Sequence, residues 1–183
     1  MNGLLYTYTT IDIYSASLPE RLIAMFFGIA INEEFFKVVI FMLLFQRVLP
    51  DVNEYDLYVY VLSVSAIFAA GEGISTGNFH SYLLLVRIVT FIPFHLVNGI
   101  TTAFFISRYL KNDGPAGIRW LFAAWLVPAV FHAIFKFGAS LLTGYFAFIP
   151  AAILLPIVIY GVVVIKRKYF NPQMVPMYRE NIL

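Results

Sequence analysis

Five apolar stretches, each about as long as a membrane-spanning helix, constrain the fold of this chain more than any other feature. They cover residues 22–45, 57–77, 82–106, 118–142 and 146–165. A helix needs about 20 mostly apolar residues to cross a bilayer. Inside lipid a helix satisfies its own backbone hydrogen bonds, which an open strand cannot do. The sequence therefore predicts an all-α fold, a polytopic transmembrane helical bundle with about five spans.

The composition agrees with a bilayer as the main solvent. Only 12% of the 183 residues are charged and 61% are hydrophobic, whereas soluble domains carry about 25% charged residues. The net charge of +2 is small and gives no reason to expect a nucleic-acid partner. The chain has no cysteine, which excludes disulfides, thiolate metal ligands and a cysteine nucleophile.

The sequence indicates one membrane domain between two polar ends. We expect a polar N-terminal segment at 1–18, a single transmembrane domain at 19–168 and a cytoplasmic tail at 169–183. The first residues have neither a basic n-region nor a clear apolar h-region. We therefore expect them to be mature sequence and not a cleaved signal.

Basic residues predict the orientation of the chain, because cytoplasmic loops carry an excess of Lys and Arg. With five spans, Arg21 and Arg87 fall at one face. Eight basic residues fall at the other: Arg47, Arg108, Lys111, Arg119, Lys166, Arg167, Lys168 and Arg179. This distribution predicts a multi-pass protein of the cell membrane with its N-terminus outside and its C-terminus in the cytoplasm.

Ionisable side chains interrupt four of the apolar stretches. They are Glu33, Glu34, Lys37, Glu72, His95, His132 and Lys136. A charge near the bilayer centre costs at least ~2.5–3.5 kcal/mol. Glu33, His95 and His132 lie roughly ten to thirteen residues from the predicted outer face, and Glu72 about five. Because such groups avoid lipid, we expect them to converge on a polar interior.

Each of these residues also has a purely structural interpretation. Glu33 and Lys37 are four residues apart and can pair on one helix face. A single buried histidine can have the purely structural role of a hydrogen-bond partner between helices. Glu72 can reach water from the end of its helix. Seven costly residues together nevertheless favour a shared site. Carboxylates and imidazoles are the common groups of acid–base catalysis.

Four motifs on successive helices follow the order of a known family. They are Glu33-Glu34-Phe-Phe-Lys37, Phe68-Ala-Ala-Gly-Glu72, Arg87 with His95-Leu-Val-Asn-Gly99, and Val127-Pro-Ala-Val-Phe-His132. They resemble the EExxK, FxxxE, Arg with HxxxG, and final histidine motifs of PrsW-type intramembrane proteases. That family belongs to a superfamily that also includes Rce-type CAAX prenyl endopeptidases.

The resemblance implies hydrolysis of a peptide bond in or near the membrane of a prokaryote. It assigns catalytic roles to five residues: Glu33, Glu34, Glu72, His95 and His132. Lys37, Arg87 and Lys136 are supporting residues, and Arg87, Asn98 or backbone amides are candidates for stabilising the oxyanion. The implied partner is a single-span membrane protein, such as an anti-sigma factor, that is cut near the outer face.

The mechanism has two forms at this stage. We favour a metal-free one in which Glu33 or Glu34 activates water, so no cofactor is expected. Two histidines and two or three glutamates could instead bind Zn²⁺ with an open coordination position.

The chain departs from the family pattern at its last motif. The family continues HxxxD or HxxxN, whereas this chain has Lys136 after His132. A catalytically inactive relative that binds membrane partners is therefore an alternative. A proton-coupled transporter or channel is another, although such proteins usually show paired repeats. Phe91-Ile-Pro-Phe-His95 also fits FxxxH of the CAAX branch, but Glu72 favours the PrsW branch.

Overall fold

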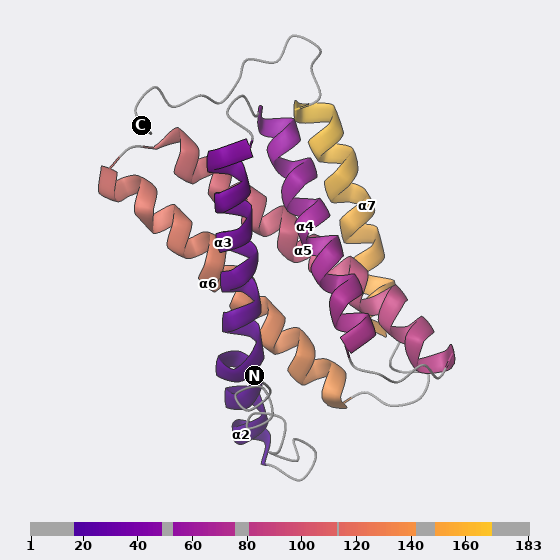
Figure 1. Cartoon of the computed structure of the whole chain (residues 1–183). Helices are drawn as coiled ribbons and strands as arrows, with labels where there is room; N and C mark the ends of the chain where they lie inside the picture. The colour runs from indigo at the N-terminus through magenta and orange to yellow at the C-terminus, as the bar shows by residue number, and fades with distance from the viewer. Residues whose placement is uncertain (1–16, 49–52, 76–80, 113, 142–148, 170–183) are drawn as a thin grey trace.

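The computed structural model of the chain describes residues 17–48, 53–75, 81–112, 114–141 and 149–169. This part of the chain is built of helices, arranged as a bundle (Figure 1). They are α2 (Leu18–Ile23), the π-helix η1 (Ala24–Ala30), α3 (Ile31–Val48), α4 (Glu54–Ser75), α5 (Ser81–Lys111), α6 (Gly114–Leu141) and α7 (Ile149–Tyr169). The predicted all-α class is confirmed. Most of the predicted N-terminal segment and C-terminal tail lies outside the described residues.

Two of the described helical segments are long and apolar enough to cross a membrane. They are Ile88–Lys111 within α5 and Gly114–Leu141, which is α6. Each predicted apolar stretch is helical wherever the structure describes it, and the first is divided among α2, η1 and α3. The number of spans stays a prediction. Large apolar side chains face outward, including Ile67 at 70% exposure and Tyr160 at 72%. Such an exterior suits contact with lipid.

The first three elements follow one another as a continuous rod (Figure 1). The rod begins where the backbone N–H and the hydroxyl of Ser17 both donate to the Glu20 carboxylate, at 2.9 and 2.7 Å. Where a π-helix changes to an α-helix, the hydrogen-bond pattern shifts and some backbone carbonyls lack a regular N–H partner. The Asn32 amide donates to two of these, the carbonyls of Phe27 and Gly28, at 3.0 and 3.3 Å. The π-helix thus ends at Ala30, within one turn of Glu33.

Helices α4 and α5 approach each other closely at Gly99. A Cβ atom at this position would lie 2.6 Å from the Ser65 hydroxyl oxygen, which is too close for any larger residue without a shift. Helix α4 is capped by the preceding residue Asn53, whose side-chain oxygen accepts from the Asp56 backbone N–H at 2.9 Å. The close approach brings the C-terminal half of α4 alongside the middle of α5.

Helix α6 is fixed to α5 by polar contacts around Pro128. Proline has no backbone N–H, so the carbonyl four residues earlier, at Ala124, loses its helical partner. The Thr102 hydroxyl of α5 donates to that carbonyl at 3.3 Å. The Asn98 amide of α5 donates to the Pro128 carbonyl at 3.2 Å. The proline therefore frees the Ala124 carbonyl, and together with the Pro128 carbonyl this acceptor holds α6 in register with α5.

The interior is apolar at one end of the bundle and polar at the other. The apolar core contains Val38, Phe41, Leu57, Tyr58, Val61, Ala103, Ile106, Leu110, Ala124 and Ile165. Apart from Val38 near the middle of α3, these residues come from the C-terminal halves of α3, α5 and α7 and the N-terminal halves of α4 and α6. The opposite halves of α3, α4 and α6, with the middle of α5, supply the buried ionisable residues. Packing of the apolar core at one end of the bundle therefore positions the ionisable side chains at the other end.

Candidate functional site

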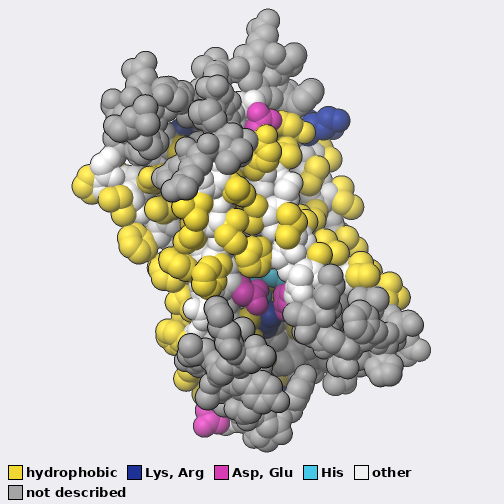
Figure 2. Space-filling view, viewed as in Figure 1, with side chains coloured by type: hydrophobic (Ala, Val, Ile, Leu, Met, Phe, Trp, Pro, Cys, Tyr) yellow, Lys and Arg dark blue, Asp and Glu magenta, His cyan; other side chains and the backbone are white. Residues whose placement is uncertain are grey.

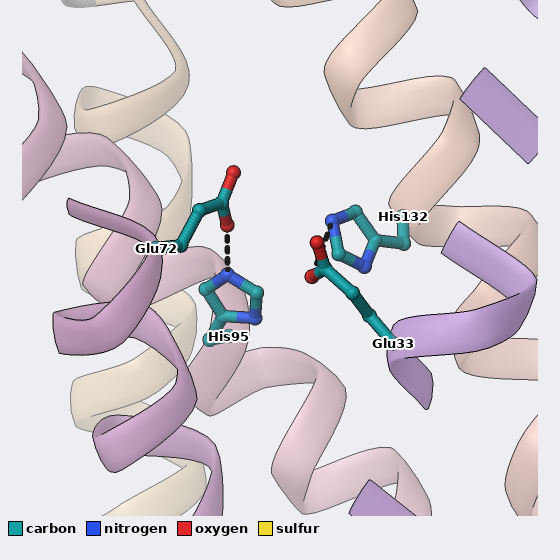
Figure 3. Close-up of side chains that lie close together, drawn as sticks. All are labelled: Glu33, Glu72, His95 and His132. Carbon is teal, nitrogen blue, oxygen red and sulfur yellow. Dashed lines mark hydrogen bonds and ion pairs between the residues drawn. The ribbon is translucent and has the colours of Figure 1, made fainter. Parts of the chain in front are cut away.

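Four helices each bring one metal-binding type of side chain to a common point (Figure 3). Glu33 comes from α3, Glu72 from α4, His95 from α5 and His132 from α6. One ligand atom from each of these residues lies within 4.8 Å of all the others. The space-filling view shows acidic, basic and histidine atoms in a hollow below a band of apolar side chains (Figure 2). The structure thus places together the four residues that the sequence put on separate helices.

Glu34 is the buried anchor of this cluster. Its side chain is only 1% exposed, and one carboxylate oxygen, Oε1, accepts three hydrogen bonds. The donors are Lys37 Nζ at 2.7 Å, His132 Nδ1 at 2.6 Å and Asn98 Nδ2 at 3.3 Å. A carboxylate so enclosed is suited to orienting other side chains, because water has little access to it.

His132 presents an unpaired nitrogen to the interior of the site. Because the Glu34 carboxylate can only accept, Nδ1 of His132 carries the proton of their hydrogen bond. The imidazole is fully buried, and its Nε2 atom has no hydrogen-bond partner among the described residues. Nε2 lies 3.8 Å from Glu33 Oε2. A neutral imidazole in this arrangement offers a lone pair to a bound cation.

His95 joins the second pair of charges. Its Nε2 lies 2.9 Å from Glu72 Oε2, and its Nδ1 lies 2.9 Å from Lys37 Nζ. A lysine ammonium has only donors, so Nδ1 accepts and Nε2 donates to Glu72. The pairing that the sequence suggested for Lys37 is corrected here. Lys37 contacts Glu34 and His95, while Glu33, four residues before it, faces His132 and Lys136.

Lys136 lies between the two more exposed acids. Its Nζ is 2.5 Å from Glu72 Oε1 and 3.7 Å from Glu33 Oε1, and the side chain is 13% exposed. Helical spacing places it one turn beyond His132 on the same face of α6. The residue that departs from the family motif is therefore a component of the charge cluster.

A cavity of about 420 Å³ opens onto the cluster between α3 and α4. Glu33 and Glu72 line it together with Ile67, Phe68 and Gly71. Glu33 is 28% exposed, compared with 15% for Glu72 and 1% for Glu34. Of the three acids, Glu33 is therefore the most accessible to water and to a peptide.

The donor set fits a divalent metal ion. Imidazole nitrogens and carboxylate oxygens are common ligands of Zn²⁺, and catalytic zinc sites use three such ligands with one position open. Histidine ligands usually donate their second ring N–H to a carboxylate, as His132 does to Glu34. The unpaired Nε2 of His132 is the atom that such a site would use. Lys136 fits least well, since it places a positive charge on Glu72.

The contacts of Asn98 differ from the role that the sequence suggested, and the contact of Trp125 was not expected from the sequence. Asn98, a candidate for stabilising the oxyanion, donates its amide hydrogens to Glu34 and Pro128 instead. Trp125 Nε1 donates to the Ile31 carbonyl at 2.7 Å and ties α6 to the start of α3. No local pattern signals this contact, because it joins residues 94 positions apart. Arg87 belongs to α5, and its side chain lies outside the described part of the structure.

Comparison with known proteins is consistent with this geometry. Residues 3–165 match a family described as PrsW family intramembrane metalloprotease. The chain is also similar to Protease PrsW of Oceanobacillus iheyensis, with 32% identity over 119 residues. The matched segment is 63% of this chain and 54% of that protein, so the chain spans about half the length of this curated relative. No solved structure matches the chain.

Proposed function

The chain belongs to the PrsW family of intramembrane metalloproteases, and on this basis we propose that it is an endopeptidase that hydrolyses a membrane protein within or beside the bilayer. The observation that carries the proposal is the convergence of Glu33, Glu72, His95 and His132 to within 4.8 Å. The accessible Glu33 and the unpaired Nε2 of His132 give this group both a base and a ligand atom.

In the proposed reaction Glu33 is the general base. It accepts a proton from the water that attacks the scissile carbonyl, and it returns that proton to the leaving amine. Glu34 is a positioning residue, because its carboxylate holds the imidazole of His132 and the ammonium of Lys37. Lys37 in turn holds His95 through Nδ1. General acid–base catalysis of this kind contributes ~10²–10⁴-fold to the rate.

Glu72, His95 and His132 are the residues that would hold a metal ion. Zn²⁺ bound there would polarise the scissile carbonyl and activate the attacking water. For His95 to offer Nε2 to the ion, its ring would have to carry the proton on Nδ1 and Lys37 would have to leave that atom. Lys136 would likewise have to leave the Glu72 carboxylate. The alternative is the metal-free glutamate mechanism, in which a chelator leaves the rate of cleavage unchanged.

Metal chelation is expected to abolish proteolysis. The purified protein is incubated with a chelator, the chelator is removed, and the rate of cleavage is measured. The rate is then measured again after Zn²⁺ is added. We expect a loss of activity that Zn²⁺ restores, because three ligands without an ion leave the carbonyl unpolarised. Unchanged activity after complete metal removal, verified by elemental analysis, would instead establish the metal-free mechanism.

Replacing Lys136 by Gln is expected to raise the affinity for Zn²⁺ by at least about fivefold, because like charges a few ångströms apart repel by about 1–4 kcal/mol. Competition with a chromophoric chelator measures this affinity without any proteolysis. Lys166→Gln, the same change at an exposed position of α7, is the matched control. Equal affinities of the two variants would show that Lys136 does not oppose the ion.

Lys136 also supports the second candidate function, an inactive relative that binds membrane partners. Its ammonium already neutralises Glu72, and a resident cation there can replace a catalytic ion. In that case the wild-type protein binds no Zn²⁺, and the Lys136→Gln variant gains binding without gaining cleavage of any single-span protein.

The proposed substrate is a single-span membrane protein, similar to an anti-sigma factor, in the cell membrane of a prokaryote. The cavity lies between α3 and α4, where Ile67 is 70% exposed on the outer surface. A substrate helix can therefore approach from the lipid and unwind into the cavity. The basic residues of the sequence support a multi-pass arrangement of domain 19–168 with the N-terminus outside and the C-terminus in the cytoplasm.

Co-expression with tagged single-span proteins tests this function. The wild-type chain is expected to release a shortened fragment from at least one of them, cut near the outer face, while Glu33→Gln releases none. Identical fragments from both forms would assign the cleavage to another protease of the host. A current across liposomes without any cleavage would favour the transporter alternative.

A further inference from the structure

Two adjoining cavities lie at the end of the bundle opposite the charge cluster, between α5 and α7. The smaller, of about 250 Å³, is lined by Glu54, Phe104, Ser107, Arg108, Lys111 and Lys168. The larger, of about 510 Å³, is lined mainly by apolar side chains of α5, α6 and α7. Phe104 and Lys168 line both. The two cavities therefore adjoin each other at these two residues. We refer to them together as the groove, which is polar at one end and apolar along the rest.

The polar end of the groove carries an excess of positive charge. Three basic residues, Arg108, Lys111 and Lys168, surround a single acid, Glu54. Glu54 contacts Lys111 at 2.5 Å and accepts a hydrogen bond from Ser107 at 2.6 Å. The guanidinium of Arg108 lies 5.2 Å from the centre of the Phe104 ring. The lining residues that the structure describes thus include more cations than anions, which favours an anionic ligand.

The apolar part of the groove lies beside a close approach of α7 to α5. A Cβ atom at Gly161 would lie 2.7 Å from the end of the Ile100 side chain, so the helices touch there. Around this contact the groove is bordered by Phe104, Phe105 and Phe131. Such a channel is long, apolar and open to the outer surface, which suits a hydrocarbon chain.

We propose that this groove binds an anionic phospholipid, with its phosphate at Arg108, Lys111 and Lys168 and an acyl chain along α5 and α7. Basic pockets between membrane helices commonly hold acidic headgroups. The sequence places the same basic residues at the predicted cytoplasmic face, where anionic lipids supply the ligand. Free phosphate would fill only the polar cavity and a neutral lipid only the apolar one. An anionic phospholipid is the ligand that satisfies both.

Quenching of tryptophan fluorescence by brominated lipids tests the site on the complete protein. Trp120 stacks on Phe105, which lines the groove, with ring centres 6.0 Å apart. The protein is reconstituted in phosphatidylcholine vesicles containing equal fractions of either brominated phosphatidylglycerol or brominated phosphatidylcholine. We expect stronger quenching by the anionic lipid. Lys168→Gln should weaken its relative binding by about fivefold, since one basic residue contributes about 1 kcal/mol at such a surface.

Lys166→Gln is the matched control, because it removes the same charge from the same helix end but lines neither cavity. It is expected to leave the lipid preference unchanged. Equal quenching by both lipids overturns the proposal, as do equal losses in the two variants, which would indicate general attraction to an anionic surface. A dimer cross-linked through α7 that removes the preference would assign the groove to a second copy. Proteolysis plays no part in these measurements.

Discussion

Replacing Glu33 by Gln is expected to lower the cleavage rate by ~10²–10⁴-fold, the usual contribution of a general base. Glutamine has nearly the same shape as glutamate, so the packing of α3 should be retained. The amide cannot take the proton of the attacking water, and this chemical difference is the reason for the effect. The initial rate of cleavage of a purified single-span substrate measures it, together with the thermal unfolding temperature of each variant.

Glu20→Gln serves as the control for this change. Glu20 lies at the start of the same helical rod, is exposed and accepts hydrogen bonds from Ser17, which a glutamine side chain also does. This variant should cleave at the wild-type rate. If Glu33→Gln retained full activity with an unchanged unfolding temperature, Glu33 would not be the base, and the proposed mechanism would be wrong.

Replacing Lys37 by Met is expected to lower the free energy of unfolding by about 3–5 kcal/mol, because it leaves a buried acid without its cation. Lys37 and Glu34 are 4% and 1% exposed, with their charged atoms 2.7 Å apart. Methionine fills a similar volume, so the effect isolates the charge. Reversible unfolding in mixed detergent micelles measures the difference. A double variant with Glu34→Gln should recover part of the loss, since both charges then disappear.

The pair Lys111–Glu54 provides the comparison. Its atoms are 2.5 Å apart, but its side chains are 48% and 18% exposed. Exposed ion pairs contribute about 0–1 kcal/mol, so Lys111→Met should change stability far less than Lys37→Met in the same neutral detergent. Equal changes in the two variants would mean that burial does not decide the strength of these pairs, contrary to the argument above.

The role of Glu34 illustrates how the structure refined a prediction. The sequence offered Glu33 and Glu34 as equivalent bases, because both belong to one motif and both lie in one apolar stretch. Adjacent helical residues point about 100° apart, so only one of them can face a given cavity. Glu34 faces Lys37, Asn98 and His132, whereas Glu33 lines the cavity. Accessibility therefore favours Glu33 as the base.

The sequence by itself determined the helical class and the positions of the helices. Apolar stretches of sufficient length allow little else in lipid, and each expected stretch is helical wherever the structure describes it. It also singled out the seven ionisable residues, since the cost of burying each requires a partner. These conclusions depend on composition and spacing along one helix, which are local properties.

Only the tertiary structure decided which of these residues contact one another. The contact of Lys37 with His95 depends on where α5 lies relative to α3, and α5 is held against α4 at Gly99 and against α6 by Thr102 and Asn98. The position of Lys136 between Glu33 and Glu72 likewise depends on how α6 packs. Contacts between residues far apart in the chain follow from helix packing. Spacing along a single helix cannot specify that packing.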